Sequence, residues 1–400
     1  MDAVHYDPFS YELDADPYPV YRALRDRAPV YRNEAHDFWA LTRFDDVLAA
    51  FLDWETWSSA RGTVLELMDL PALPPIMIFT DPPRQTRLRN LVSKVFTPRR
   101  VSALEPEIRR IAAGYLDPLV GKERFDVVKE FTAKLPMDVI SALLGIPPAD
   151  RDAVRESSND MMHRDPGSPF PPRRAIEANA KLVAYFTAAL DERRRQPRDD
   201  LMSALLAAEI RGEDGRRTKL TGEEVVMFAN LLASAGNETV TKFLASSLYW
   251  LWRCPDERRA LRAEPGLIPN AVEETLRYDP PSQYQGRTTT REVSLHGRLI
   301  PKGAKVLLVN AATGRDERRF PDPERYDVRR TIDLHLGFGY GHHVCLGASF
   351  ARLESRIALE EILRRFPEWD VAKDGIEWMH SSNVRGMSGL VLEIPGPRQV

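Results

Sequence analysis

The chain has 400 residues, 43% of them hydrophobic and 29% charged, and its formal net charge is -3. This composition is typical of a globular protein with a large core, and it gives no overall basic field for binding nucleic acid. Two cysteines cannot build a disulfide framework, no apolar stretch reaches the roughly 20 residues of a membrane span, and the acidic, proline-bearing N-terminus does not resemble a signal peptide. We therefore expect a cytoplasmic protein that binds neither a membrane nor nucleic acid.

The first part of the chain alternates between short predicted helices and prolines, with a strand pair expected at 29–31 and 38–41. Residues 63–79 contain several prolines and are unusually apolar for a loop, because loops normally run over the surface and are polar. Such a segment either packs as an irregular part of the core or lines an apolar pocket. Both interpretations stay open.

Helical periodicity dominates residues 84–252, with interruptions at 145–150 and 163–172. Thr221 followed by Glu224 predicts a capping box, and Cys254-Pro255 predicts the end of the same helix about 32 residues later. The middle of this helix is apolar or small on every face, so we expect it to run through the centre of the protein.

Alternating β-branched residues between 284 and 308 predict a small sheet, and an amphipathic helix is expected from about 346 to 366. No internal repeat, low-complexity tract or long linker divides the chain. We therefore expect one domain over residues 1–400 that is mainly α with a small β portion.

The segment FGYGHHVCLG at 338–347 is the most informative part of the sequence. Its glycines predict a tight turn in which the backbone closely approaches another group. Cys345 then stands at the start of the next helix, where the partial positive charge of the helix N-terminus lowers the pKa of a thiol.

Three interpretations of Cys345 follow from the residues alone. A buried structural thiol would not need the glycine turn. A zinc site would crowd His342, His343 and Cys345 together, with no second cluster of ligands elsewhere. A haem-thiolate ligand gives a role to the glycines, to the helix start and to Phe338.

The segment resembles the haem-binding loop Phe-Gly-x-Gly-x-His-x-Cys-x-Gly of the cytochrome P450 superfamily. The positions that match are Phe338, Gly339, Gly341, His343, Cys345 and Gly347. The resemblance implies that Cys345 binds the iron of haem b, that Phe338 packs near it and that His343 contacts a propionate. It also implies the cytochrome P450 fold, with the haem between the long central helix and the helix after the cysteine loop.

The central helix contains the sequence AGNET at 235–239, which places a carboxylate beside a hydroxyl in apolar surroundings. Ala235 and Gly236 would let a flat ligand lie against the helix, whereas Thr239 bonding back to the preceding turn is the alternative. The motif is similar to the family signature Ala/Gly-Gly-x-Asp/Glu-Thr. The resemblance implies that Thr239 forms a hydrogen bond to the activated dioxygen and that Glu238, in place of the commoner aspartate, helps to relay protons to it.

Two arginines are expected to bind the haem propionates, because the guanidinium fork suits carboxylates. They are Arg287, at the start of the small sheet, and Arg89, in the first predicted helix after the apolar loop. Gln85 stands where the family usually has histidine, so it keeps a hydrogen-bond donor without a positive charge. We expect it to contact the cofactor as well.

Glu274 and Arg277 lie three residues apart on one helical face, where a carboxylate and a guanidinium can pair. They resemble the Glu-x-x-Arg pair of the family, which is structural and is completed by a further arginine. We expect Arg325 to be that arginine.

The resemblance implies a haem-thiolate monooxygenase that receives electrons from a ferredoxin and ferredoxin reductase, or from a flavodoxin-type donor. Its substrate would be an apolar small molecule such as a fatty acid, terpenoid, steroid or polyketide, in secondary or lipid metabolism. The expected docking charges for the donor are Arg99, Arg100, Arg352 and Arg356. The expected substrate contacts are 64–79, 161–170, Leu232, Ala235, 282–284 and 384–387.

Two alternatives remain. A haem-thiolate peroxygenase would use hydrogen peroxide, but the resemblance ties the pair Glu238 and Thr239 to dioxygen activation. A non-catalytic haem sensor or carrier would be expected to offer a sixth iron ligand, and the AGNET segment contains no histidine, methionine or lysine.

Overall fold

The computed structural model describes residues 4–74, 76–162, 171–211 and 217–395. Most of the interruption predicted at 163–172 therefore lies outside the described residues. The helices are α1 (Glu12–Ala15), α2 (Tyr18–Arg27), α3 (Phe44–Leu52), α4 (Arg84–Ser93), α5 (Pro98–Ala103), α6 (Glu105–Leu116), α7 (Leu135–Leu144), α8 (Arg151–Met162), α9 (Arg173–Arg195), α10 (Leu201–Ala207), α11 (Gly222–Arg253), α12 (Pro255–Ala263), α13 (Ile268–Tyr278), α14 (Asn310–Thr313) and α15 (Ala348–Arg365).

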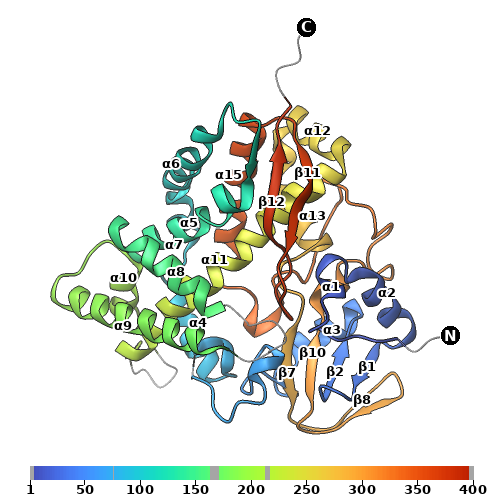
Figure 1. Ribbon diagram of the computed structural model, residues 1–400. Helices are drawn as coiled ribbons and strands as arrows, with labels where there is room; N and C mark the ends of the chain where they lie inside the picture. Colours follow the sequence, from blue (N-terminus) through green and yellow to red (C-terminus); the bar gives the residue numbers. More distant parts are fainter. Residues whose placement is uncertain (1–3, 75, 163–170, 212–216, 396–400) are drawn as a thin grey trace.

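The strands are β1 (Val30–Asn33), β2 (Phe38–Leu41), β3 (Trp57–Ser58), β4 (Arg124–Asp126), β5 (Glu209–Arg211), β6 (Arg217–Lys219), β7 (Gln285–Thr289), β8 (Val293–Leu295), β9 (Arg298–Ile300), β10 (Lys305–Leu308), β11 (Asp370–Trp378) and β12 (Met387–Glu393). The prediction of a mainly α protein with a small β portion is confirmed. Helices α6 to α10 occupy one side of the molecule, and β1, β2, β7 and β10 lie together on the other side (Figure 1).

Helix α11 runs between these two parts, as its apolar sequence predicts (Figure 1). The predicted capping box is present: Thr221 Oγ1 accepts a hydrogen bond from the N–H of Glu224 at 3.1 Å, and Glu224 Oε2 accepts one from the N–H of Thr221 at 2.9 Å. The helix ends at Arg253 because Pro255 begins α12 and cannot continue the hydrogen-bond ladder.

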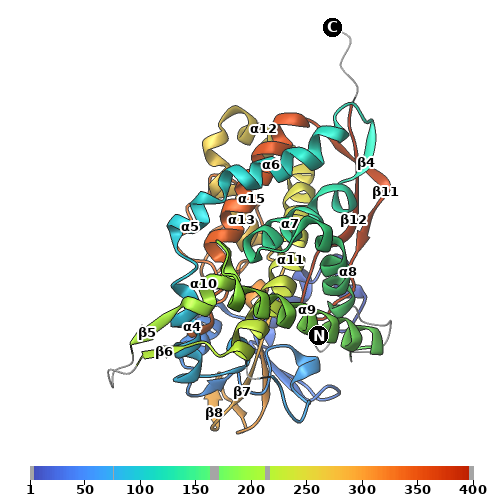
Figure 2. The ribbon, with the colours of Figure 1, turned by 90° about the vertical axis from the view of Figure 1, so that its left-hand side faces the viewer.

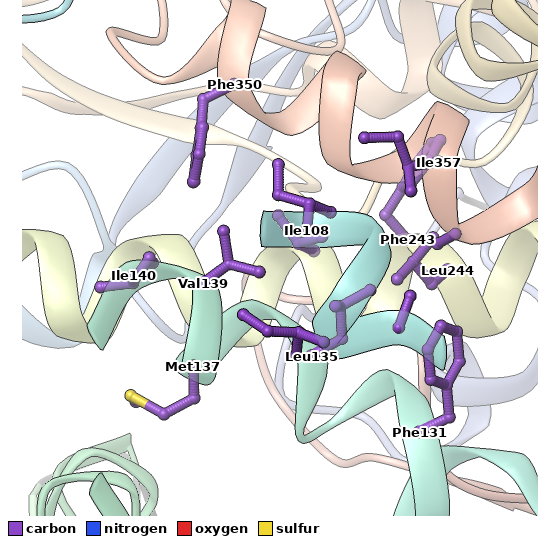
Figure 3. Close-up of a cluster of buried hydrophobic side chains, with 14 of the residues drawn as sticks. Ile108, Phe131, Leu135, Met137, Val139, Ile140, Phe243, Leu244, Phe350 and Ile357 are labelled. Atoms are coloured by element: carbon purple, nitrogen blue, oxygen red, sulfur yellow. The ribbon is translucent and has the colours of Figure 1, made fainter. Parts of the chain in front are cut away.

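Helices α7 and α15 pack beside α11, α6 packs against α7 and α15, and the four helices together form the main core (Figure 2). Figure 3 shows side chains from all four helices meeting in this cluster, and each large apolar side chain that leaves water contributes about 1.5–3 kcal/mol. The labelled residues of these helices are Ile108, Leu135, Met137, Val139, Ile140, Phe243, Leu244, Phe350 and Ile357.

The five-stranded sheet has the strand order β1-β2-β10-β7-β3. The predicted strand pair is confirmed as the antiparallel pair β1 and β2, while β10 runs parallel to β2 and antiparallel to β7. Arg287 lies opposite Val306 in the β7–β10 pair, so the middle of the sheet fixes the position of this arginine. A second sheet joins β11, β12 and β4.

The apolar loop 63–79 fits both interpretations that its sequence left open. Leu65 and Met68 are buried in a cluster with Tyr6 and Tyr284, so the first half of the loop belongs to the core. Met77, in the second half, lines a cavity beside α11.

The buried pair of Glu274 and Arg277 has a different third partner from the one expected. Arg277 Nε lies 2.7 Å from Glu274 Oε2, and both side chains are fully buried. The third guanidinium belongs to Arg330, whose Nε lies 3.3 Å from Glu274 Oε1. The prediction of Arg325 is wrong, because at that residue only the backbone carbonyl faces the pair and accepts a hydrogen bond from Arg277 at 3.2 Å.

Candidate functional site

A cavity of about 320 Å³ lies between α11 and the loop that precedes α15. Its walls are mostly apolar and come from α11, α13, β7 and the cysteine loop. Candidate site residues that line it are Arg89, Ala235, Gly236, Thr239, Arg287, Phe338, Gly339, His343, Cys345 and Gly347. The structure therefore brings together residues that are up to roughly 260 positions apart in the chain, as only a tertiary fold can do.

The cysteine loop is the tight turn that its glycines predict. Gly339 and Gly341 have φ angles of 67° and 68°, a region that residues with a side chain rarely adopt. A Cβ atom at Gly341 would also clash with the backbone oxygen of Phe51. The turn closes through a hydrogen bond of 2.9 Å from the N–H of Cys345 to the carbonyl of Phe338.

The side chain of Cys345 is exposed, and its exposed surface faces the cavity inside the protein rather than the outer surface. Burial raises the pKa of its thiol above the usual value, while the N–H of Gly347 and the charges of Arg89 and Arg352 lower it. The sequence predicts a lowered pKa from the helix start alone. That prediction is wrong for the free thiol, because desolvation outweighs the hydrogen bond from Gly347 and the charges of both arginines.

Three basic side chains face the cavity without a carboxylate partner among the described residues. Arg287 donates only to the carbonyl of Gly286, at 2.7 Å, and Arg89 donates to the carbonyl of His342 at 3.3 Å. Burial lowers the pKa of Arg287 to about 10. Burial, together with the two arginines, lowers the pKa of His343 to about 3, and its buried Nε2 has no hydrogen-bond partner. This arrangement can bind an anion inside the cavity.

Gln85 does not line the cavity, unlike the other residues expected to contact a cofactor. Its side chain is fully buried, and Nε2 donates a hydrogen bond of 2.5 Å to the carbonyl of His342. Gln85 therefore ties α4 to the cysteine loop, and its neutral amide suits a backbone acceptor.

The acid and the hydroxyl of α11 occupy different surroundings. Thr239 lines the cavity, and its Oγ1 donates to the carbonyl of Ala235 at 2.9 Å, the back-bonding that the sequence leaves as an alternative. Glu238 does not line the cavity, because its Oε1 lies 3.0 Å from Nζ of Lys242. Lys242 is 5% exposed, and its Nζ also donates to the carbonyl of Met387 at 3.0 Å.

Lys242 is a residue of the site that the sequence analysis did not identify. The signal was present, because Glu238 and Lys242 stand four residues apart, and that spacing brings an acid and a base together on a helix. It was hidden by the apolar sequence around it, which indicates burial but not which polar groups meet.

The glycines at the cavity serve two different purposes. A Cβ atom at Gly236 would overlap Cδ1 of Ile140 on α7, so a larger residue there would require the side chain of Ile140 to move. A Cβ atom at Gly347 would meet nothing within 4 Å, and its φ of -83° is ordinary. Protein packing thus leaves free space beside Gly347, which lines the same cavity as Cys345.

The expected substrate contacts are brought to the cavity in part. Leu232, Ala235 and Ser282 line it, as do two residues of the apolar loop, Met77 and Ile78. The segment 384–387 and Tyr284 are not among its lining residues, and residues 163–170 lie outside the described residues.

Two of the four expected docking arginines are engaged in ion pairs. Arg352 Nε lies 2.6 Å from Glu273, and Arg356 pairs with Glu105 at 2.7 Å and with Glu360 at 2.9 Å. Arg99 and Arg100 are exposed.

Neither a zinc cluster nor a membrane helix is found within the described ranges. They contain no group of three or more His, Cys, Asp or Glu side chains that could hold a metal ion. None of their helices combines the length and the apolar content needed to cross a membrane.

Comparisons with known proteins agree over nearly the whole chain. A family model described as cytochrome P450 matches residues 172–395. The vitamin D(3) 25-hydroxylase of Pseudonocardia autotrophica is 40% identical over 98% of this chain and 97% of its own. The cytochrome P450 monooxygenase PikC of Streptomyces venezuelae is 38% identical over 95% of this chain and 91% of its own. The solved structure of cytochrome P450 CYP109Q5 from Chondromyces apiculatus has a TM-score of 0.89 and 37% identity, and the match covers 98% of this chain and 99% of that one.

Proposed function

The chain belongs to the cytochrome P450 family, and from this premise we propose that it is a haem-thiolate monooxygenase that hydroxylates or epoxidises an apolar small molecule. The observation that carries the proposal is the placement of Cys345 and Thr239 on two different elements around one apolar cavity. Haem is the cofactor of the family, and the form proposed here is haem b.

The residues around the cavity fit a haem. Cys345 offers the thiolate for the iron, and the space beside Gly347 and Gly339 leaves room for a flat ring next to it. Arg89, Arg287 and His343 supply the partners for two propionates, which would satisfy the orphaned Nε2 of His343. Ala235, Gly236 and Phe338 complete the walls. When it is bound, haem supplies the oxygen chemistry, and a thiolate ligand favours O–O cleavage.

The chain itself contributes water exclusion and proton transfer. The apolar walls keep water from the reacting atoms. Thr239 Oγ1 is a hydroxyl that can pass a proton into the cavity, and Glu238 is the acid one residue away. Because Glu238 is held by Lys242, its carboxylate must leave this ion pair to reach Thr239. Glu238 and Thr239 are therefore proposed as the catalytic pair.

The substrate proposed for this site is an apolar molecule such as a fatty acid, terpenoid, steroid or polyketide. The walls carry few polar groups, and one relative is named as a vitamin D(3) 25-hydroxylase. The proposed electron donor is a ferredoxin with its reductase, or a flavodoxin-type protein. The exposed arginines Arg99 and Arg100 offer it complementary charge.

The first test is the absorption spectrum of the reduced protein under carbon monoxide, for the wild type and two variants. We expect a Soret band strongly shifted to the red in the wild type and in Cys254→Ser, the matched control at the other cysteine. Cys345→Ser should lose that band. A Cys345→Ser variant that keeps the band would contradict the ligand assignment.

The second test separates the monooxygenase from a peroxygenase and from a non-catalytic haem carrier. Product formation from a bound substrate is compared with electrons from a ferredoxin system and with hydrogen peroxide alone. We expect product with the ferredoxin system, and Thr239→Ala should divert most of the electrons away from product. Product with peroxide only would favour the peroxygenase, and no product with either would favour the carrier.

A further inference from the structure

A second cavity of about 190 Å³ lies between α4, the 3-10 turn at Met77–Phe79 and the first turns of α11, and we call it the vestibule. Its outer walls are apolar and include Leu88 and Val92 of α4 together with Leu220 and Met227 near the start of α11. None of the residues to which the proposed function assigns a role in haem binding or catalysis lines it.

Three apolar side chains separate the vestibule from the larger cavity that Cys345 and Thr239 line, which we call the haem cavity. Met77, Phe228 and Leu231 line both cavities, so they form the partition between them. No charged group stands in this partition. A methionine has three rotatable bonds and repacks at low cost, so an apolar chain can pass from one cavity to the other.

The mouth of the vestibule carries two opposite charges. Arg84 and Glu223 line the vestibule and are exposed. No hydrogen bond or ion pair of either side chain is found among the described residues, although the charge of Arg84 also acts on the neighbouring Glu224. Glu224, the other acid that lines the vestibule, already forms an ion pair with Arg87 at 2.8 Å and accepts a hydrogen bond from the N–H of Thr221.

We propose that the vestibule binds the uncharged polar end of an elongated substrate whose apolar remainder lies in the haem cavity. Arg84 offers only donors and Glu223 only acceptors, so a hydroxyl or an amide, which both donates and accepts, can satisfy the two. A carboxylate would pair with Arg84 but would be repelled by Glu223 and Glu224. An ammonium group would pair with Glu223 but would be repelled by Arg84. This inference rests on the proposed function, because it places the reacting end of the substrate at the haem.

The test uses imidazoles that carry an alkyl chain of increasing length on N1. Imidazole binds the haem iron of the intact holoenzyme, and the shift of the Soret band then reports the dissociation constant without any turnover. The chains end in methyl, hydroxyl, carboxylate or ammonium. Beyond the length that reaches the mouth, we expect the hydroxyl probe to bind roughly tenfold more tightly than the methyl probe, as for a hydrogen bond to a charged group.

Variants assign the effect to the mouth and to the partition. Arg84→Leu and Glu223→Leu should each remove most of the hydroxyl advantage, whereas Arg99→Leu, an exposed arginine outside the vestibule, should leave it unchanged. Leu231→Phe should narrow the passage between the two cavities and weaken the binding of only the long probes. Unsubstituted imidazole should bind all of these variants equally.

Several results would overturn the inference. They are tightest binding of the carboxylate or the ammonium probe, an equal affinity of hydroxyl and methyl probes at every length, and a hydroxyl advantage that survives both mouth variants. A wild-type protein without the thiolate-type carbon monoxide spectrum would instead contradict the proposed function, so the two failures are distinguishable.

Discussion

At the scale of single residues, the ion pair between Glu238 and Lys242 is the feature that most affects the proposed chemistry. Both side chains are largely buried, with side-chain exposures of 16% and 6%, and the pair sits beside the cavity but outside its wall. Removing one partner of a buried ion pair leaves an uncompensated charge, which costs far more than the pair contributes. Lys242 thus determines where the proposed proton donor rests.

Lys242→Met is expected to lower the free energy of unfolding by about 3 kcal/mol, because Glu238 is left buried without its partner. Glu238→Gln alone should also destabilise, since the buried ammonium group of Lys242 then keeps neutral acceptors, such as the carbonyl of Met387, but no opposite charge. The double variant should recover much of the loss. Urea unfolding of the three variants measures this coupling, and losses that simply add would show that the two residues do not interact.

Glu354, on α15, is fully buried, and neither carboxylate oxygen has a hydrogen-bond partner among the described residues. Burial raises its pKa from 4.5 to about 8. Between these values the native protein binds one proton more than the unfolded chain. The free energy of unfolding therefore falls as pH rises from 4.5 to 8, by at most about 1.4 kcal/mol per pH unit.

Glu354→Gln removes this dependence, because glutamine is neutral in both states. Its stability relative to the wild type should rise from pH 4.5 to 8 and stay level above pH 8. Urea unfolding at a series of pH values checks this, with the exposed Glu393→Gln as the control. A constant difference across the range would mean that Glu354 is ionised in the native protein.

At the scale of elements, the joint between α7, α9 and α10 depends on one glycine. Gly145 ends α7 in the left-handed region, with φ 74° and ψ 29°. Its carbonyl accepts a hydrogen bond from Arg193 at 2.7 Å, and Arg193 also pairs with Asp200, the cap of α10, at 2.8 Å. A Cβ atom at Gly145 would clash with Asp200, which these bonds hold in place.

Gly145→Ala is expected to cost about 2 kcal/mol or more, from the strained backbone and the clash together. Gly114→Ala is the matched control, because Gly114 is exposed within α6 and a Cβ atom there meets nothing. Gly114→Ala should stabilise by up to about 1 kcal/mol through helix propensity. Thermal unfolding shows whether each variant is more or less stable than the wild type. A Gly145→Ala variant as stable as the wild type would contradict the rigid joint.

The elements that the sequence predicts well are those with local signals. The long helix follows from Thr221 and Glu224 at its start and from Pro255 after its end, and the cysteine turn follows from its glycines. The direction of a side chain after folding has no comparable local signal. For this reason the sequence points to Arg325 where Arg330 lies, and it gives no sign that the amide of Gln85 bonds to the cysteine loop.

At the scale of the whole molecule, Asp279 joins distant segments at one point. It accepts hydrogen bonds from Tyr18 of α2 at 2.6 Å, from Trp250 of α11 at 2.8 Å and from Arg385, between β11 and β12, at 2.9 Å. Although burial raises the pKa of Asp279, the charge of Arg385 and these hydrogen bonds hold it below its usual value.

Asp279→Asn is expected to lower the free energy of unfolding by about 3 kcal/mol or more. The amide leaves Arg385 buried without a charge partner, and its NH2 group turns a donor toward either Tyr18 or Trp250. Thermal unfolding measures the loss against Asp374→Asn, which changes an exposed acid of β11. Equal effects of the two variants would mean that the junction carries little of the stability.

The order of strands in the five-stranded sheet has a consequence for how the protein is made in a cell. β2 pairs with β10, whose residues leave the ribosome roughly 260 positions later, or tens of seconds at about 5–20 residues per second. During that time β2 presents an open edge that another nascent chain can bind. We therefore expect the yield of folded protein to depend on translation rate and chaperone supply more than on the stability of the finished fold.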